Sequence, residues 1–84
     1  KNNVHLYPNP SNGLFNISLN LPRLSNVEIQ IFSSIGKIVH TQTLNDIKTG
    51  NKQINLKNLS AGFYLIEYKI EDDSIFEKIS IIND

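Results

Sequence analysis

The chain has 84 residues with eight basic and eight acidic side chains, so its formal net charge is zero. A chain of this size hides only about 60 to 65% of the surface that its unfolded form exposes, which places it near the lower limit of independent stability. Nucleic-acid binding depends largely on neutralising phosphates, so nucleic acid is a poor candidate partner. The absence of Cys excludes thiol catalysis, thiolate metal sites and disulfides.

No apolar run approaches the roughly 20 residues that a membrane-spanning helix needs. The sequence opens at Lys1 without Met and without a charged leader followed by an apolar stretch. We therefore expect a piece of a longer precursor. Asn, which suits turns, and β-branched Ile are both frequent, and this composition favours β-structure over helices.

The first part of the chain alternates polar and apolar residues with the period of two that is typical of strands. A short strand over Val4–Tyr7 is predicted to end at Pro8 and Pro10, which remove backbone donors and mark an edge or entry segment. Asn12 and Gly13 predict a turn. The half-buried strand that follows is expected to bury Phe15, Ile17 and Leu19.

The next segment, Leu21–Ser25, contains Pro22 and is expected to cross between strands or sheets. A hairpin is predicted after it, with a tight turn at Ser34–Lys37 in which Gly36 takes a positive φ, and a return strand over Ile38–Leu44. The first strand of this hairpin is expected to bury alternate residues, namely Val27, Ile29 and Ile31.

The polar segment Asn45–Lys52 is predicted as a loop, followed by a brief strand with Ile54 and Leu56 on one side. Leu59 is expected to fill the core from a turn. The longest apolar stretch, Phe63–Glu71, is predicted as a central strand with one buried face made of Tyr64, Ile66, Tyr68 and Ile70.

Asp72 and Asp73 are expected to turn the chain into a last strand over Ser74–Ile82. About seven short strands with no helices between them predict an all-β fold, an Ig-like antiparallel β-sandwich with Greek-key connections. A small barrel is the alternative. We expect one domain over residues 1–84, with residues 1–5 as a candidate linker.

Few residues could carry catalysis. The two histidines, His5 and His40, are expected to face solvent from strands, and they lack metal-ligand spacing. No serine lies in a G-x-S-x-G elbow, so we expect no enzyme and no catalytic, metal or cofactor site. The acidic run Glu71–Asp73 resembles half of a calcium site, but a solvated hairpin turn explains it better.

Several short motifs occur in a fixed order along the chain. The first comprises Tyr7, Pro8, Asn9 and Pro10, followed by Gly13 and Ile17. Later come Gly36 and Lys37 before Val39, then Leu59, Ser60, Ala61 and Gly62 before Tyr64, and finally Lys78. Over about Tyr7–Ile82 the chain thus resembles the C-terminal sorting domains, type A, that cargo proteins of the type IX secretion system carry in Bacteroidota.

The resemblance implies an Ig-like sandwich that directs a preceding cargo, often a protease, glycosidase or adhesin, across the outer membrane. It implies a type IX translocon and an outer-membrane shuttle protein as partners, together with the covalently linked upstream cargo and a sorting-domain peptidase. It also implies that the precursor carries a separate leader and that the cargo is released or joined to surface lipopolysaccharide. We expect the domain to be a monomer.

We predict that the machinery recognises the folded sandwich, with the exposed last strand over Ser74–Ile82 available for strand pairing and Lys78 setting specificity. The candidate recognition residues are the motif residues Tyr7, Pro8, Asn9, Pro10, Gly13, Gly36, Lys37, Gly62, Tyr64 and Lys78. One alternative is an Ig-like or fibronectin-like spacer. Another is a carbohydrate-binding module, which would require Phe63, Tyr64 and Tyr68 to be exposed.

Overall fold

The computed structural model describes residues 1–82, which form five antiparallel strands and no helix. The strands are β1 (Asn3–Tyr7), β2 (Leu14–Phe32), β3 (Ile38–Asn55), β4 (Gly62–Ile70) and β5 (Asp73–Ile81). Within this part of the chain, no helix is long and apolar enough to cross a membrane.

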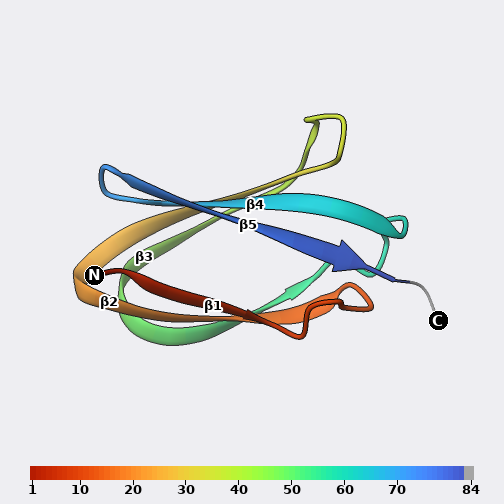
Figure 1. The fold of residues 1–84 in the computed structure, drawn as a ribbon. Helices are drawn as coiled ribbons and strands as arrows, with labels where there is room; N and C mark the ends of the chain where they lie inside the picture. Colours follow the sequence, from red (N-terminus) through yellow and green to blue (C-terminus); the bar gives the residue numbers. More distant parts are fainter. Residues whose placement is uncertain (83–84) are drawn as a thin grey trace.

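The strands are arranged in two layers because β2 and β3 are long and each runs through both of them (Figure 1). The first part of β2, Leu14–Asn20, pairs with β1 on one side and with the second part of β3 on the other. From Val27 onward, β2 pairs with the first part of β3 and with β4, which pairs with β5. Five continuous strands therefore build the sandwich for which the sequence predicts about seven.

The connection from β3 to β4 passes from one layer to the other. As a result β4 pairs with β2, which is distant in the chain, and not with β3, which precedes it. Non-consecutive neighbours of this kind are typical of Greek-key connections. The predicted all-β, Ig-like antiparallel sandwich is confirmed.

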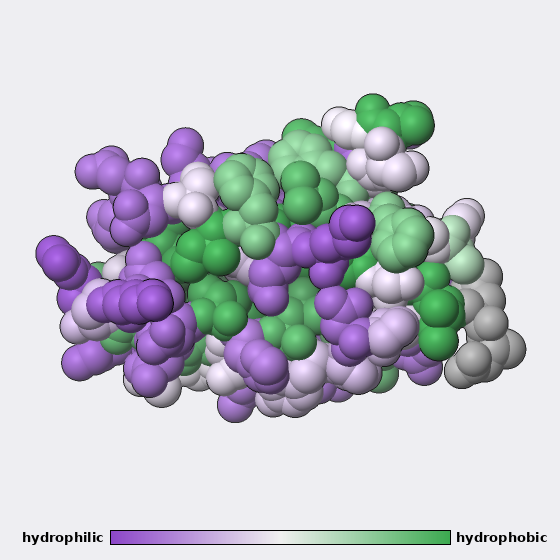
Figure 2. All heavy atoms as spheres, viewed as in Figure 1, coloured by the Kyte–Doolittle hydropathy of each residue, from purple (hydrophilic) through white to green (hydrophobic). Residues whose placement is uncertain are grey.

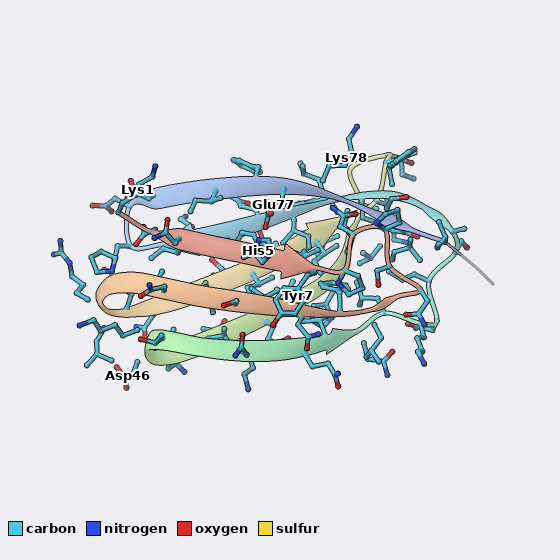
Figure 3. All side chains as sticks on the ribbon, turned by 60° about the horizontal axis from the view of Figure 1, so that its bottom comes forward. Lys1, His5, Tyr7, Asp46, Glu77 and Lys78 are labelled. Carbon is cyan, nitrogen blue, oxygen red and sulfur yellow. The ribbon has the colours of Figure 1, made fainter. Side chains whose placement is uncertain are left out.

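The crossing between layers is partly where the sequence predicts it. The register of β2 against β3 shifts between Asn20 and Ser25, so the predicted crossing at Leu21–Ser25 is confirmed. The predicted loop at Asn45–Lys52 is wrong, because these residues continue β3 through its own bend. That bend lies at one end of the sandwich, at the position of Asp46 (Figure 3). The Asp46 N–H there donates a hydrogen bond to Asn26 Oδ1 at 3.0 Å.

The polar composition of Asn45–Lys52 predicts a loop although the segment is a strand. The reason is that β3 is an edge strand, which pairs only with β2. Most side chains of this segment are exposed, and Ile47 packs against the core. An edge strand at the rim of a sandwich does not need the strict alternation of a strand whose face is covered. The segment therefore forms a strand without showing the usual pattern.

The core lies between the layers and is filled by alternate residues of the strands. Fully or nearly buried side chains include Phe15, Ile17, Leu19, Val27, Ile29, Ile31, Tyr64, Ile66, Tyr68 and Ile70, as predicted. Leu59 packs against this core from the turn before β4, also as predicted. Burying each large aliphatic or aromatic side chain contributes about 1.5 to 3 kcal/mol, so these faces supply most of the driving force for folding.

The first strand belongs to the fold. Leu6 is buried and Val4 packs against the core, while Asn3 and His5 pair with Asn20 and Ser18 of β2. The expectation that residues 1–5 form a linker is therefore wrong for Asn3–His5. Alternation over these residues is what places Val4 and Leu6 on the core-facing side.

Candidate recognition surface

The entry motif, Tyr7–Pro10, carries the chain from the end of β1 to the outer edge of β5. Both of its prolyl bonds, Tyr7–Pro8 and Asn9–Pro10, are cis. Proline has no N–H, so the backbone of this segment has few donors to offer a neighbouring strand. The hydrogen bonds to β5 come instead from the side chain of Asn9.

Asn9 bonds to the backbone of β5 through both ends of its carboxamide. Its Nδ2 donates to the Lys78 carbonyl at 2.9 Å, and its Oδ1 accepts from the Ser80 N–H at 3.1 Å. An adjacent strand would satisfy the same kinds of backbone group. The carboxamide therefore takes the place of a strand at this edge.

Ser11 extends the contact to the end of β5 as a parallel bridge with Ile81. Its N–H donates to the Ser80 carbonyl at 2.9 Å, and its carbonyl accepts from the Ile82 N–H at 2.8 Å. We call Asn9 and Ser11, together with residues 78–82 of the last strand, the terminal clasp. It joins the two ends of the described chain into one unit.

A buried turn holds Ser11 in this position. The Ser11 hydroxyl donates to the Leu14 carbonyl and accepts from the Gly13 N–H, both at 3.0 Å. Gly13 has a φ of 104° and lies so close to Lys57 that a Cβ would be 2.9 Å from the Lys57 Cα. The predicted turn at Asn12 and Gly13 is confirmed, and glycine is required there by both conformation and space.

The terminal clasp corrects one expectation about the last strand. Its edge is covered by Asn9 and Ser11 from Lys78 to Ile82, so the prediction of an exposed strand over Ser74–Ile82 is wrong for its second half. On that side of β5, residues 1–82 supply no further backbone partner for Asp73–Glu77. Only this first half remains open to another strand.

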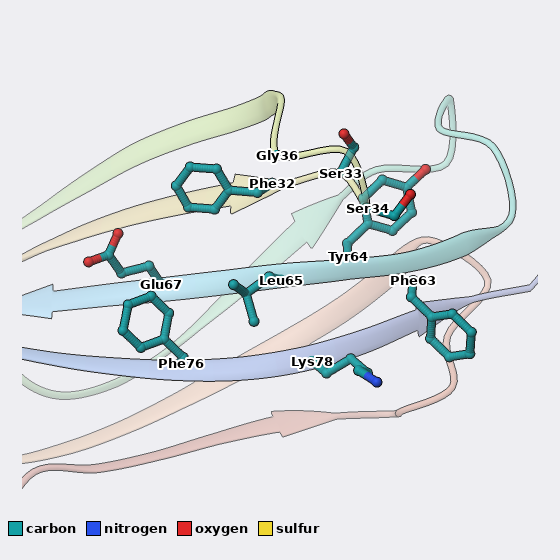
Figure 4. Close-up of a pocket in the computed structure, with 10 residues that line it drawn as sticks. All are labelled: Phe32, Ser33, Ser34, Gly36, Phe63, Tyr64, Leu65, Glu67, Phe76 and Lys78. Carbon is teal, nitrogen blue, oxygen red and sulfur yellow. The ribbon is translucent and has the colours of Figure 1, made fainter.

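A hollow of about 510 Å³ lies on the outer face of β4 and β5, below the turn that joins β2 to β3 (Figure 4). Its floor contains three exposed apolar side chains, Phe63, Leu65 and Phe76, which are 60%, 40% and 55% exposed. Ser33, Ser34 and Gly36 of the turn line another side. We call this site the outer hollow.

Apolar side chains reach the surface over β4 and β5 among polar ones (Figure 2). Lys78 belongs to this region and points away from the sandwich (Figure 3). Its Nζ lies 5.2 Å from the centre of the Phe63 ring, a distance typical of a cation–π interaction. Within residues 1–82, no carboxylate lies within ion-pair distance of this ammonium group.

The structure divides the predicted recognition residues into two groups. Gly36, Tyr64 and Lys78 line the outer hollow, whereas Asn9 and Gly13 build the terminal clasp and its turn. Tyr64 is only 9% exposed and its hydroxyl donates to the Ser60 carbonyl at 2.7 Å, so its ring and hydroxyl mainly stabilise the turn before β4.

The remaining motif residues are dispersed. Tyr7 is 40% exposed, and its ring stacks on the His5 ring with the two ring centres 5.4 Å apart. Pro8, Pro10 and Lys37 are exposed, and Gly62 begins β4. No single surface therefore contains all the residues that the motifs single out.

Sequence reasoning missed Ser11, Leu65 and Phe76 as parts of these sites, and it considered Phe63 only for the carbohydrate-binding alternative. A signal existed for the aromatic floor, because Phe63 and Leu65 are apolar although they alternate with the buried residues of β4. Apolar residues on the wet face of a strand indicate either a second covering layer or a binding surface. Ser11 carried no comparable signal, since its hydrogen bonds depend on residues far away in the chain.

A buried polar pair lies behind the outer hollow, between β4 and β5. Tyr68 is fully buried, and burial raises the pKa of its phenol, with the nearby Glu77 carboxylate raising it further. Neither the Tyr68 hydroxyl nor Glu77 Oε1 has a hydrogen-bond partner among the described residues. Glu77 places an inward-facing carboxyl group on an edge strand, a feature that discourages pairing with a foreign strand.

Residues considered for catalysis or metal binding are scattered. His5 is exposed as expected, but His40 is half-buried and its Nε2 lies 3.1 Å from Gln42 Oε1, because its register opposite Ile31 turns it toward the core. The acidic run forms a turn in which Glu71 has a φ of 54°. Residues 1–82 contain no group of three or more side chains that could hold a metal ion.

These features describe a β-sandwich with a surface suited to recognition. The chain matches the family described as the secretion system C-terminal sorting domain over residues 5–82. It is also 32% identical over 83 residues to ulvan lyase NLR42 from Nonlabens ulvanivorans, an alignment that covers 95% of this chain and 14% of the relative. The chain belongs to the family of secretion system C-terminal sorting domains.

Membership settles the general function. Domains of this family are sorting signals of cargo proteins of the type IX secretion system, and the proteins that carry them are secreted or attached to the cell surface by way of the outer membrane. The family is a sorting family and not a catalytic one. The chain spans only about one seventh of the relative's length, so the lyase activity in that relative's name is not assigned to this chain.

Proposed function

We propose that residues 1–84 act as a single non-catalytic sorting domain that the export machinery recognises in its folded form. The terminal clasp carries this proposal. Asn9 and Lys78 are hydrogen-bonded although they are 69 positions apart in the chain, so both motifs are presented together only after folding. A receptor that reads an unfolded tail would not need this arrangement.

A translocon component and an outer-membrane shuttle protein are the proposed partners, with the cargo covalently attached upstream. A sorting-domain peptidase is a further proposed partner. The domain itself is proposed to be a monomer. The terminal clasp supports this, because the covered residues Lys78–Ile82 cannot pair with the same residues of a second copy.

The motif residues are proposed to act in two ways. The exposed ones contact the machinery directly, namely Tyr7, Pro8, Pro10, Gly36, Lys37 and Lys78. Asn9, Gly13, Gly62 and Tyr64 act as scaffold, because they hold the terminal clasp and the start of β4 in place. Substitutions in the first group should impair sorting without unfolding the domain.

The test is a reporter fused upstream of this domain in a host that has the pathway. Lys78→Ala should reduce the amount of reporter at the cell surface. The control is Lys69→Ala, which should leave that amount unchanged, because Lys69 is an exposed lysine of β4 that does not line the outer hollow. Deletion of Lys78–Asp84 should abolish surface delivery. Undiminished delivery after that deletion would contradict the proposal.

The two prolines of the entry motif provide a second test. Replacing Pro8 and Pro10 with Ala should impair sorting more than it lowers Tm, because both rings are exposed. If sorting and Tm decreased to a similar extent, the two prolines would serve only to stabilise the fold.

The alternatives make different predictions. A spacer would work equally well between two reporter domains, whereas a sorting domain should work only at the C-terminal end of the fusion. A carbohydrate-binding platform would need exposed aromatic rings, and burial of Tyr64 and Tyr68 argues against it although Phe63 is exposed.

A further inference from the structure

We propose that the outer hollow binds an extended segment of a partner protein that carries an aromatic or large aliphatic side chain next to a carboxylate. This inference rests on the proposed function, because the partner would be one of the components that recognise the domain. It names a site and a ligand chemistry that the motif residues alone do not define.

The floor of the outer hollow calls for an apolar occupant. Phe63, Leu65 and Phe76 expose much of their surface side by side on two adjacent strands, although the wet face of such strands is usually polar. A volume of about 510 Å³ lies within the range of sites that bury a small organic group, so one or two aromatic side chains would fit. Covering these three side chains would remove apolar surface from water.

The charges at the site call for an anion at one end. Lys78 lies over the Phe63 ring, is exposed and lines the outer hollow, so its ammonium group can reach a ligand bound there. Glu67 also lines the outer hollow, and its Oε2 accepts a hydrogen bond from the Ser74 hydroxyl at 3.1 Å. A second carboxylate would be repelled by Glu67 and attracted by Lys78, which sets the direction of the segment.

The wall of the outer hollow favours a peptide over a lipid chain. Ser33, Ser34 and Gly36 contribute hydroxyl and backbone groups there, and the Ser33 hydroxyl already accepts a bond from the Lys37 N–H. The space beside Gly36 is open, with no atom within 4 Å of a Cβ built on it. A peptide backbone can use such groups, whereas an acyl chain would desolvate them without replacing their hydrogen bonds.

The binding test uses two synthetic peptides, acetyl-Gly-Phe-Asp-Phe-Gly-amide and its Asp→Asn counterpart, titrated into the ¹⁵N-labelled 84-residue chain. Signals of Phe63, Leu65, Phe76 and Lys78 should move, and the Asp peptide should bind at least about fivefold more tightly than the Asn peptide. Lys78→Gln should abolish that difference. The control Lys69→Gln should keep it, since Lys69 does not line the outer hollow.

Equal affinity for the two peptides, or signal changes confined to other parts of the domain, would overturn the proposal. So would dodecylphosphocholine micelles that move the same signals when the peptides do not, since the occupant would then be a lipid. Dispersion of the amide spectrum shows for each variant that the fold is intact.

An export experiment separates this inference from the proposed function. In the reporter fusion, Phe76→Ser should reduce surface delivery, and the matched change Leu24→Ser, at an exposed apolar residue outside the outer hollow, should not. If delivery needs the domain but tolerates Phe76→Ser, the outer hollow is not the docking site and the sorting function stands. If delivery does not need the domain at all, both proposals are wrong.

Discussion

Two edge strands of the sandwich, β5 in one layer and the second half of β3 in the other, are protected in different ways. The edge of β5 is closed over Lys78–Ile82 by the terminal clasp, in which a side chain replaces a strand. β3 pairs only with β2, and along its second half Asp46, Lys48 and Lys52 provide charges instead. The comparison teaches that one edge is closed by specific hydrogen bonds and the other is merely made unattractive for pairing.

The largest effect is expected from breaking the turn that holds the closed edge. Gly13→Ala should lower the free energy of unfolding by about 2 to 4 kcal/mol, because the new Cβ would meet the Lys57 backbone at a φ unsuited to Ala. Gly36→Ala, also at positive φ but in open space, should cost only about 1 kcal/mol. Urea denaturation measures both, and similar costs would show that backbone crowding at Gly13 is unimportant.

Removal of the side chain that replaces a strand should have the next largest effect. Asn9→Ala should cost about 1 to 2 kcal/mol, because two exposed hydrogen bonds to β5 are lost. Hydrogen exchange at the Ser80 amide should become faster, while exchange at amides of β3 should not change. Asn51→Ala, at an exposed position of β3, is the control, and unchanged Ser80 exchange in the Asn9 variant would refute the role of the clasp.

The edge of β3 is expected to depend on its charged side chains for protection, because no side chain or strand covers it among the described residues. Replacing both Lys48 and Lys52 with Thr should change the free energy of unfolding by no more than about 0.5 kcal/mol, since both are exposed. It should shorten the lag before aggregation severalfold, because it removes positive charge from an edge that can still pair. Light scattering during incubation measures this, with Lys57→Thr outside the strand as the control; an unchanged lag would count against charge protection.

The smallest effect is expected at the buried polar pair of β4 and β5, Tyr68 and Glu77, which lies beside the uncovered half of β5. Tyr68→Phe should change stability by less than about 1 kcal/mol at neutral pH and in the stabilising direction, because it removes a buried hydroxyl without a partner among the described residues. A destabilisation above that size would mean that the hydroxyl is satisfied in solution.

The same variant should differ in its response to alkaline pH. In the folded chain the pKa of Tyr68 is raised, whereas in the unfolded chain it is near the usual value of about 10. The unfolded state therefore releases this proton first, and the stability that the protonated phenol provides is complete below about pH 10 and is lost as pH rises above it. Tyr68→Phe should lack this part of the decline in stability, measured by urea denaturation at several pH values.

Alternation made several parts of the fold predictable from the sequence. The buried faces of β2 and β4 follow from residues two apart, such as Phe15 and Ile17, because successive side chains of a strand point to opposite sides. The turn at Asn12 and Gly13 was predictable for a similarly local reason, the tolerance of Gly for positive φ. The family resemblance likewise rested on short motifs in a recognisable order.

The course of β3 was not predictable in this way. Asn45–Lys52 shows no alternation because it bends between layers along an exposed edge, and its pairing with β2 is decided by the partner strand. His40 was misjudged for the same reason, since its register opposite Ile31 turns it inward. Local pattern indicates a strand only where one face must be covered.

The sequence by itself determined which residues form strands with a buried face, where the tight turns lie, and to which family the chain belongs, because each depends on residues close together in the chain. The tertiary structure alone decided that Asn9 and Ser11 close the edge of β5 and that Phe63, Leu65 and Phe76 meet around one hollow. Those arrangements join residues from separate strands or from opposite ends of the chain. Contacts of that kind depend on how the layers pack, which no periodicity along the chain encodes.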